Sequence, residues 1–164
     1  MLYHVCKMNE KNINENGGGI LEFLKFILIT AIIVVPVRLW VAQPFLVSGA
    51  SMEPTFQNGN YLIVDEISYH LRAPKKNEVV IFRYPKDPSK FFIKRIIGLP
   101  GESVTENGKT TFLDNDEYFV MGDNRDASSD SRIWGPVKED LIIGRAFIRL
   151  WPLNEIEINP GKQI

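Results

Sequence analysis

The chain has 164 residues, a length that predicts one domain with a single hydrophobic core and excludes a large multidomain assembly. Hydrophobic residues make up 45% and charged residues 24%, which is typical of a folded protein and not of a disordered one. Lys and Arg total 19 against 20 Asp and Glu, so no overall positive charge favours nucleic acid as a partner.

Cysteine and histidine are scarce, and this limits the possible chemistry. The single cysteine, Cys6, excludes an internal disulfide and a cysteine-based zinc cluster. The two histidines are His4, near the N-terminus, and His70, in an ordinary strand-end context. We therefore expect no metal, no cofactor and no histidine base. A nucleophile in this chain would take its base from lysines or carboxylates.

The chain begins with a polar segment. Residues 1–19 are rich in asparagine and close with three glycines, a composition that predicts a flexible arm. Met8 is an alternative start within this arm.

An apolar segment follows over residues 20–43, with an uninterrupted apolar run from Phe26 to Val37. A run of this length occurs in membrane spans, in buried helices and in the cores of signal peptides. A buried helix in a small domain would not be apolar on nearly every face, and residues 41–44 form a poor cleavage site. We therefore predict a transmembrane helix over 20–43, with Lys25 and Arg38 reaching towards its two interfaces.

The distribution of basic residues predicts the orientation of this helix. Three lysines lie before it or at its start, whereas no Lys or Arg lies between Arg38 and Arg72. The positive-inside rule then places the N-terminus in the cytoplasm. The expected location is the cell membrane, crossed once, with the lipid bilayer as a partner and residues 44–164 as an extracytoplasmic domain.

Residues 44–164 predict a mainly β fold. Five short segments are rich in β-branched or aromatic residues, namely Tyr61–Ile67, Glu78–Tyr84, Phe91–Gly98, Glu117–Gly122 and Leu141–Trp151. The dipeptide Asn107-Gly108 lies between two shorter β-like runs and is typical of a hairpin turn. We expect a compact antiparallel β-domain tethered by the one N-terminal helix.

A serine nucleophile can use a lysine as its base when burial keeps the amine neutral. A free lysine titrates near about 10.4, and burial lowers this pKa by up to about 3 to 5 units. Lys94 shares a strand face with Phe92 and Ile96, but Arg95 has equally apolar neighbours on the other face. Periodicity therefore leaves open which of the two is buried, and a lysine on an edge strand would instead extend into water.

Two other segments have both a catalytic and a purely structural interpretation. Ser51 follows the small residues of VSGA, and Pro54 sets a turn after it, an arrangement that would admit a peptide backbone but also suits an ordinary turn. Residues 122–132 concentrate charged and hydroxyl side chains, which alone is typical of a solvated loop.

In their order and amino-acid sequence these segments resemble the bacterial type I signal peptidases, membrane-tethered Ser/Lys proteases that remove signal peptides from exported preproteins. The matching pieces are SMEPT (51–55), EVVIFRYP (78–85), KRIIGLPGE (94–102), MGDNRDASSDSRIWGPV (121–137) and GRAFIRLWPLN (144–154). Several motifs in one order are a far more specific signal than any single motif. Only 23 residues separate Lys94 from Tyr118, so the chain resembles a minimal form without the large inserted domain of some members.

The resemblance implies a role for each matching residue. Ser51 would be the nucleophile and Lys94 the general base. Ser128 would orient the Lys94 amine, while Asp130 and Arg132 would hold the acidic loop in shape. The residues implied to bind the small side chains of an Ala-x-Ala type cleavage site are Phe45, Val47, Met52, Phe56, Phe92 and Ile93.

The chain also departs from the family pattern. Some members have a serine, used as an oxyanion donor, where this chain has Gly49, and here Ser48 lies one position earlier. The backbone N–H of Ser51 is one candidate donor, and the second is left open. Ala127 replaces a common asparagine and Glu102 a common aspartate, and neither change removes a catalytic group.

The expected function is that of a serine endopeptidase that cleaves preproteins at the outer face of a membrane. One alternative is a narrow-specificity, pilin-type processing peptidase. Another is an inactive membrane-anchored binding module, against which the presence of Ser51, Lys94 and Ser128 argues.

Overall fold

The structure is a computed structural model that describes residues 18–40 and 42–161. The chain divides between Pro36 and Val37 into two units, and each is described by itself. The arm predicted over residues 1–19 lies outside the described residues except for its last two positions.

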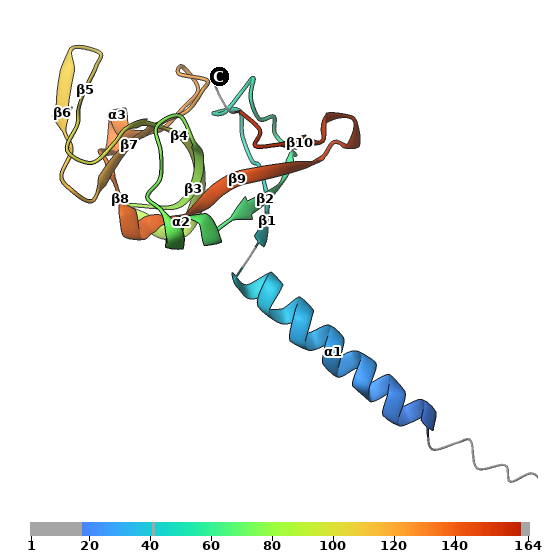
Figure 1. Ribbon diagram of the computed structural model, residues 1–164. Coiled ribbons are helices and arrows are strands. Elements are labelled where there is room, and N and C mark those ends of the chain that lie inside the picture. Colours follow the sequence, from blue (N-terminus) through green and yellow to red (C-terminus); the bar gives the residue numbers. More distant parts are fainter. Residues whose placement is uncertain (1–17, 41, 162–164) are drawn as a thin grey trace, which may run out of the picture. The chain divides into compact units, whose positions relative to one another are not determined.

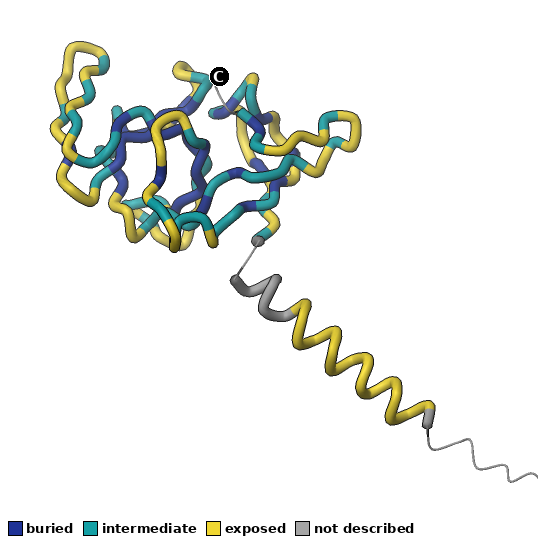
Figure 2. The backbone as a smooth tube through the Cα atoms, in the orientation of Figure 1, coloured by how far each residue is buried: buried dark blue, intermediate teal, exposed yellow. Residues whose placement is uncertain are grey.

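The apolar segment forms helix α1 (Gly18–Trp40), as the sequence predicted (Figure 1). Every residue of α1 from 19 to 34 is exposed (Figure 2). Most of these residues have large apolar side chains. Among the described residues, no helix has both the length and the apolar character needed to cross a membrane. The transmembrane span predicted over 20–43 is therefore not confirmed.

The second unit is built on an antiparallel sheet, which confirms the predicted mainly β class (Figure 1). Within the described residues its eight strands are β1 (Ala42–Leu46), β2 (Tyr61–Asp65), β3 (Val79–Tyr84), β4 (Asp87–Gly98), β7 (Glu117–Met121), β8 (Val137–Lys138), β9 (Ile142–Trp151) and β10 (Glu157–Ile158). The sheet order is β1-β2-β9-β3-β4-β7-β8, and β10 pairs with β9. Each of the five predicted strands corresponds to one of these.

Strand β1 was not predicted. Residues 42 and 43 were expected in the helix, but they pair with Asp65 and Val64 of β2. Pro44 is tolerated in this strand because β1 is at the edge of the sheet, where a missing N–H leaves no partner unsatisfied. The edge position matters below, because β1 leads directly into the loop that carries Ser51.

The predicted hairpin is confirmed. Strands β5 (Ser103–Glu106) and β6 (Lys109–Phe112) form a separate two-stranded sheet, paired from Ser103↔Phe112 to Glu106↔Lys109. The two turn residues, Asn107 and Gly108, have φ values of 51° and 76°. Positive φ at both positions is the requirement of the tight hairpin turn that Asn-Gly favours.

Short helical segments complete the unit: α2 (Ile67–Leu71), α3 (Ser131–Trp134) and the 3₁₀ turns η1 (Glu139–Leu141) and η2 (Leu153–Glu155). The strand predicted over Tyr61–Ile67 ends earlier because the Asp65 side chain accepts hydrogen bonds from the backbone N–H and the hydroxyl of Ser68. A side chain that bonds the backbone locally in this way competes with the sheet ladder and starts a helical turn.

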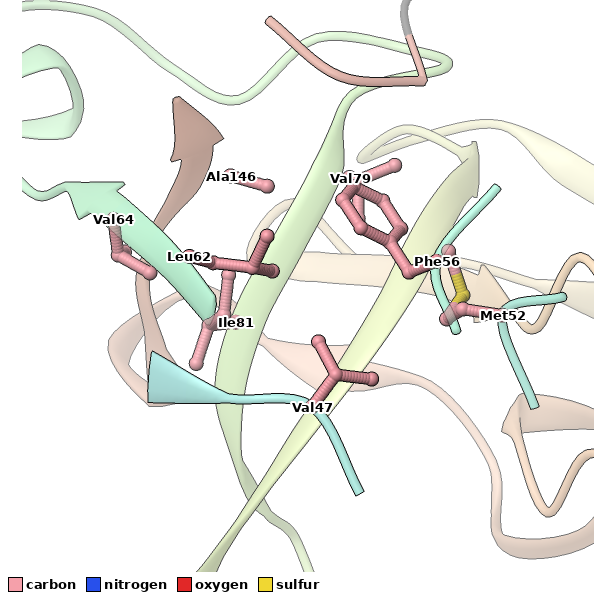
Figure 3. Close-up of a cluster of buried hydrophobic side chains, with 8 residues drawn as sticks. All are labelled: Val47, Met52, Phe56, Leu62, Val64, Val79, Ile81 and Ala146. Carbon is pink, nitrogen blue, oxygen red and sulfur yellow. The ribbon is translucent and has the colours of Figure 1, made fainter. Parts of the chain in front are cut away.

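Two main clusters of apolar side chains form the core. The first contains Val47, Met52, Phe56, Leu62, Val64, Val79, Ile81 and Ala146 (Figure 3). The second contains Val80, Phe82, Ile96, Tyr118, Val120 and Val137. Successive residues of β3 fall alternately in the two clusters, so the middle of the sheet is buried on both faces.

Burial on both faces answers the question that periodicity left open. Lys94 and Arg95 are adjacent in β4, pair with Val80 and Val79 of β3, and are only 4% and 2% exposed. Both cations are therefore withdrawn from water, which is costly unless each is neutralised or paired.

Candidate functional site

Ser51 and Lys94 meet although they are 43 residues apart in the chain. Ser51 lies in the loop between β1 and β2, and Lys94 projects from β4. The Lys94 Nζ lies 2.7 Å from Ser51 Oγ and 2.8 Å from the carbonyl oxygen of Ile93, to which it donates a hydrogen bond. The structure thus brings together the two residues for which the sequence suggested nucleophilic chemistry.

The environment of Lys94 favours its neutral form. Burial lowers the pKa of Lys94 to about 8, against a smaller opposing effect of the Asp130 and Asp123 carboxylates. At this pKa about a tenth of the amine is neutral at pH 7 and about half at pH 8. A substantial fraction of the protein can therefore accept a proton from a serine hydroxyl near neutral pH.

The loop that carries Ser51 is fixed by polar contacts on both sides of it. Gly49 has a φ of 91°, and its N–H donates to the Asn58 side chain at 2.9 Å. The Asn124 N–H donates to the Ser51 carbonyl at 3.1 Å. A side chain at position 49 would be strained at this φ, which is a physical reason for glycine here.

Gly122 lets two loops approach each other closely. One is the acidic loop, residues 122–132, and the other is the loop between β1 and β2 that carries Ser51, called the serine loop below. A Cβ at position 122 would collide with the side chain of Ser128 and with the carbonyl oxygen of Ser51. Gly122 has no predicted role in the sequence. Its only signal was a glycine at the end of the predicted strand Glu117–Gly122, where a close backbone approach is a common reason for glycine.

Asp130 and Arg132 form the ion pair that shapes the acidic loop. Asp130 is fully buried and accepts from Arg132 Nε at 2.8 Å, Arg132 Nη2 at 2.9 Å and the Gly122 N–H at 3.1 Å. Burial alone would raise the pKa of Asp130, but the hydrogen bonds from Arg132 and Gly122 hold it below its usual value. This geometry suits the loop-holding role that the resemblance implied.

Ser128 is buried beside this pair, but its hydroxyl has no hydrogen-bond partner among the described residues. The hydrogen bonds described for the Lys94 amine go to Ser51 and to the Ile93 carbonyl. The orienting role of Ser128 therefore stays a prediction.

Three residues without a predicted role form a second buried network. Arg95 contacts Asp123 through Nε at 2.7 Å and through Nη2 at 2.6 Å, and the Thr55 hydroxyl donates to the same carboxylate at 2.6 Å. Burial would raise the pKa of Asp123, but Arg95 and Thr55 hold it below its usual value. The Asp123 carboxylate thereby joins β4, the serine loop and the acidic loop.

A cleft of about 520 Å³ opens at Ser51 and Lys94. Of the predicted binding residues, Phe45, Val47, Phe92 and Ile93 line it. The other two, Met52 and Phe56, do not. The turn after Ser51, closed by a 2.9 Å hydrogen bond from the Phe56 N–H to the Met52 carbonyl, directs both side chains into the core, where they are 1% and 0% exposed (Figure 3).

Comparison with known proteins identifies the family. The family described as signal peptidase, peptidase S26, matches residues 20–115 and 105–151. Probable signal peptidase I-2 of Synechocystis sp. is 35% identical, with 83% of this chain and 75% of the relative covered. Signal peptidase I of Leptolyngbya laminosa is 33% identical, with 86% and 85% covered. Mitochondrial inner membrane protease subunit 1 of Homo sapiens is 35% identical, with 71% and 74% covered.

The chain belongs to the signal peptidase family, peptidase S26. This confirms the family predicted from the motifs and, with it, the prediction of a serine endopeptidase. The matched residues include both Ser51 and Lys94, so the site described above lies within the part of the chain that the family shares.

The Asp123 network predicts a large difference between two conservative substitutions. We expect Asp123→Asn to destabilise the protein by about 3 kcal/mol, because it leaves the Arg95 cation buried without a counter-charge. Asp116→Asn is the matched control, since the ion pair of Asp116 with Lys138 is mostly exposed and contributes little. Urea unfolding followed by tryptophan fluorescence measures both. Equal midpoints for the two variants would contradict the importance given to the network.

Proposed function

We propose that this member of the signal peptidase family removes signal peptides from preproteins after Ala-x-Ala type sites, with Ser51 as nucleophile and Lys94 as general base. The observation that carries the proposal is the 2.7 Å contact between a buried lysine amine and a serine hydroxyl at the wall of a cleft. The names of the bacterial relatives, signal peptidase I, support the substrate class.

The geometry supports a two-step hydrolysis. The neutral Lys94 amine takes the Ser51 proton while Oγ attacks the scissile carbonyl carbon. The tetrahedral intermediate collapses, the Lys94 ammonium returns the proton to the leaving amine, and the signal peptide remains as an ester on Ser51. Lys94 then takes a proton from water, which attacks the ester, and Ser51 regains its proton as the signal peptide leaves.

The developing oxyanion needs a hydrogen-bond donor close to the nucleophile. The backbone N–H of Ser51 is the donor that we assign to this role. The Gly49 N–H is engaged by the Asn58 side chain and is thereby occupied in the structure.

The lining of the cleft fits the proposed cleavage site. Phe45, Val47, Phe92 and Ile93 offer an apolar wall, and Ala50 and Ala127 contribute only methyl groups. An apolar wall suits the methyl side chains of alanine better than a charged residue. We assign substrate recognition to these cleft residues and not to Met52 or Phe56.

Substitution of the two catalytic residues tests the mechanism directly. We expect Ser51→Ala and Lys94→Ala each to lower kcat for a preprotein with an Ala-x-Ala site by at least about 10³-fold, because nucleophile and base act as one unit. Lys94→Arg should be equally inactive, since a guanidinium stays protonated. Cleavage by the detergent-solubilised full chain, analysed by mass spectrometry, gives both rate and position.

The matched controls for that experiment are Ser103→Ala and Lys86→Ala, which change the same residue types at exposed positions that do not line the cleft. Both should cleave like the unsubstituted protein. Full activity in either catalytic variant would refute the mechanism. Binding of the preprotein without cleavage by the unsubstituted protein would favour the inactive binding module.

The lowered pKa of Lys94 predicts the pH dependence of catalysis. The base must be unprotonated, so kcat/KM should rise with pH through an apparent pKa of about 8 and fall tenfold per unit below it. A lysine in water would place the same rise near about 10.4. Initial rates between about pH 6 and 10 measure the profile. A midpoint above about 10 would show that Lys94 is solvated or is not the base.

We also propose that α1 holds the enzyme at the cell membrane, with the N-terminus in the cytoplasm and the β-domain on the outer side. Two observations support this proposal. The described side chains of α1 are exposed and largely apolar, and a human relative is named as an inner membrane protease. Hydrocarbon lipid is a favourable environment for such a surface, whereas water is not.

Membrane attachment and its direction can be measured on the full chain in cells. We expect the protein to stay in the pellet after alkaline carbonate extraction, because apolar contact with lipid does not depend on charge. Protease added outside intact spheroplasts should degrade the β-domain. Extraction into the supernatant would contradict attachment, and protection of the β-domain in unlysed spheroplasts would reverse the proposed orientation.

A further inference from the structure

The last described segment of the chain folds back onto the sheet and ends beside the catalytic strand. Strand β10 pairs with β9 (Figure 1), and the Asn159 N–H donates to the Phe147 carbonyl at 2.7 Å. Asn159 and Gly161 both have left-handed backbone conformations, with φ of 53° and 75°, and Pro160 between them is buried. The segment is therefore a folded part of the β-domain.

Gly161 completes the hydrogen bonding of a buried arginine. Its carbonyl oxygen accepts from Arg95 Nη1 at 2.5 Å, and the Asn77 carbonyl accepts from the same nitrogen at 2.8 Å. The other two guanidinium nitrogens of Arg95 contact Asp123. Because Arg95 is only 2% exposed, water cannot readily replace a lost acceptor, and the guanidinium would shift to find one.

Gly161 also lies directly against Thr55. A Cβ at position 161 would lie 2.6 Å from Thr55 Cγ2 and 3.1 Å from Arg95 Nη2, so the neighbours would have to move. Thr55 could withdraw its methyl by rotating about χ1, but this rotation would take its hydroxyl away from the Asp123 carboxylate. A side chain at position 161 therefore disturbs the Asp123 network, whether Thr55 or Arg95 moves to make room for it.

Thr55 is also bonded by Arg149, a residue that the same segment contacts. Arg149 of β9 donates through Nη1 to the Thr55 carbonyl at 2.9 Å and through Nε to the Glu155 carbonyl at 2.9 Å. The Arg149 side chain is 14% exposed, so these hydrogen bonds are largely shielded from water. The serine loop is thus bonded to Arg149, which follows Thr55 by 94 positions in the chain.

We infer that the segment Glu155–Gly161 positions the catalytic pair: it fixes Thr55 and Arg95, and through them the loop of Ser51 and the strand of Lys94. Thr55 lies four residues after Ser51, and Arg95 is the residue next to Lys94. A shift in either neighbour moves a reacting atom, and small misplacements of reacting groups are costly in rate. The inference rests on the proposed roles of Ser51 and Lys94.

Position 161 predicts a distinctive kinetic effect. No residue of this segment is among those that line the cleft, within the described part of the chain, so substrate binding should change little. We expect Gly161→Ala in the detergent-solubilised full chain to lower kcat by at least about tenfold while KM stays within about twofold. Rates are taken well below the thermal unfolding transition of each variant, so that loss of folded protein does not enter.

Gly108→Ala is the matched control. Gly108 has a φ of 76°, close to that of Gly161, and a Cβ there would meet nothing within 4 Å. The control therefore carries the same backbone strain without the collision, and its kcat should stay within about twofold of the unsubstituted protein. Equal kcat values for Gly161→Ala and Gly108→Ala would overturn the inference.

A second substitution tests whether the collision with Thr55 is the cause. Thr55→Ser removes the methyl group that a Cβ at 161 would strike and keeps the hydroxyl that bonds Asp123. In the Thr55→Ser background the loss caused by Gly161→Ala should shrink to about threefold or less. An undiminished loss would refute this route. Ser51→Ala is measured in parallel, because cleavage by that variant would refute the proposed function itself.

Discussion

The removal of one lysine amine from water is the constraint on which this site depends. Lys94 is buried because β3 and β4 are covered on both faces, and its pKa falls to about 8 as a result. Two carboxylates oppose this shift, but each is paired with an arginine, Asp130 with Arg132 and Asp123 with Arg95. Because the arginines neutralise the carboxylates, the negative charge near the amine does not restore the ordinary lysine pKa.

The Asp123 carboxylate explains how segments far apart in sequence hold one geometry. It accepts hydrogen bonds from Thr55 of the serine loop and from Arg95 of β4, and Arg95 in turn donates to Gly161. A buried, hydrogen-bonded ion pair contributes little net stability compared with apolar packing, but it has strict geometric requirements. We interpret its value here as precision in the distance between two reacting atoms.

Around Ser51 and Lys94 the fold forms a largely apolar cleft next to the edge strand of the sheet. The edge strand β1 leads into the serine loop, and side chains from β1 and β4 form the cleft wall. The Ser51 turn directs Met52 and Phe56 inward, where they anchor the loop to the core (Figure 3). The same short segment therefore presents the nucleophile on one side and secures it by apolar packing on the other.

Local patterns in the sequence determined the strands and the Asn107-Gly108 hairpin, because each depends on residues close in the chain. The pairing of Ser51 with Lys94, 43 residues away, was expected only from the resemblance of several ordered motifs to one family. The alternation of apolar and polar residues along a strand could not show that Lys94 and Arg95 are both buried, because it assumes that one face of the strand is exposed to solvent. The resemblance implied a substrate-binding role for Met52 and Phe56, whereas the structure places both side chains in the core. Only the tertiary structure brought Thr55 and Gly161 to Asp123 and Arg95, across separations of 68 and 66 residues, because such contacts depend on how the strands pair.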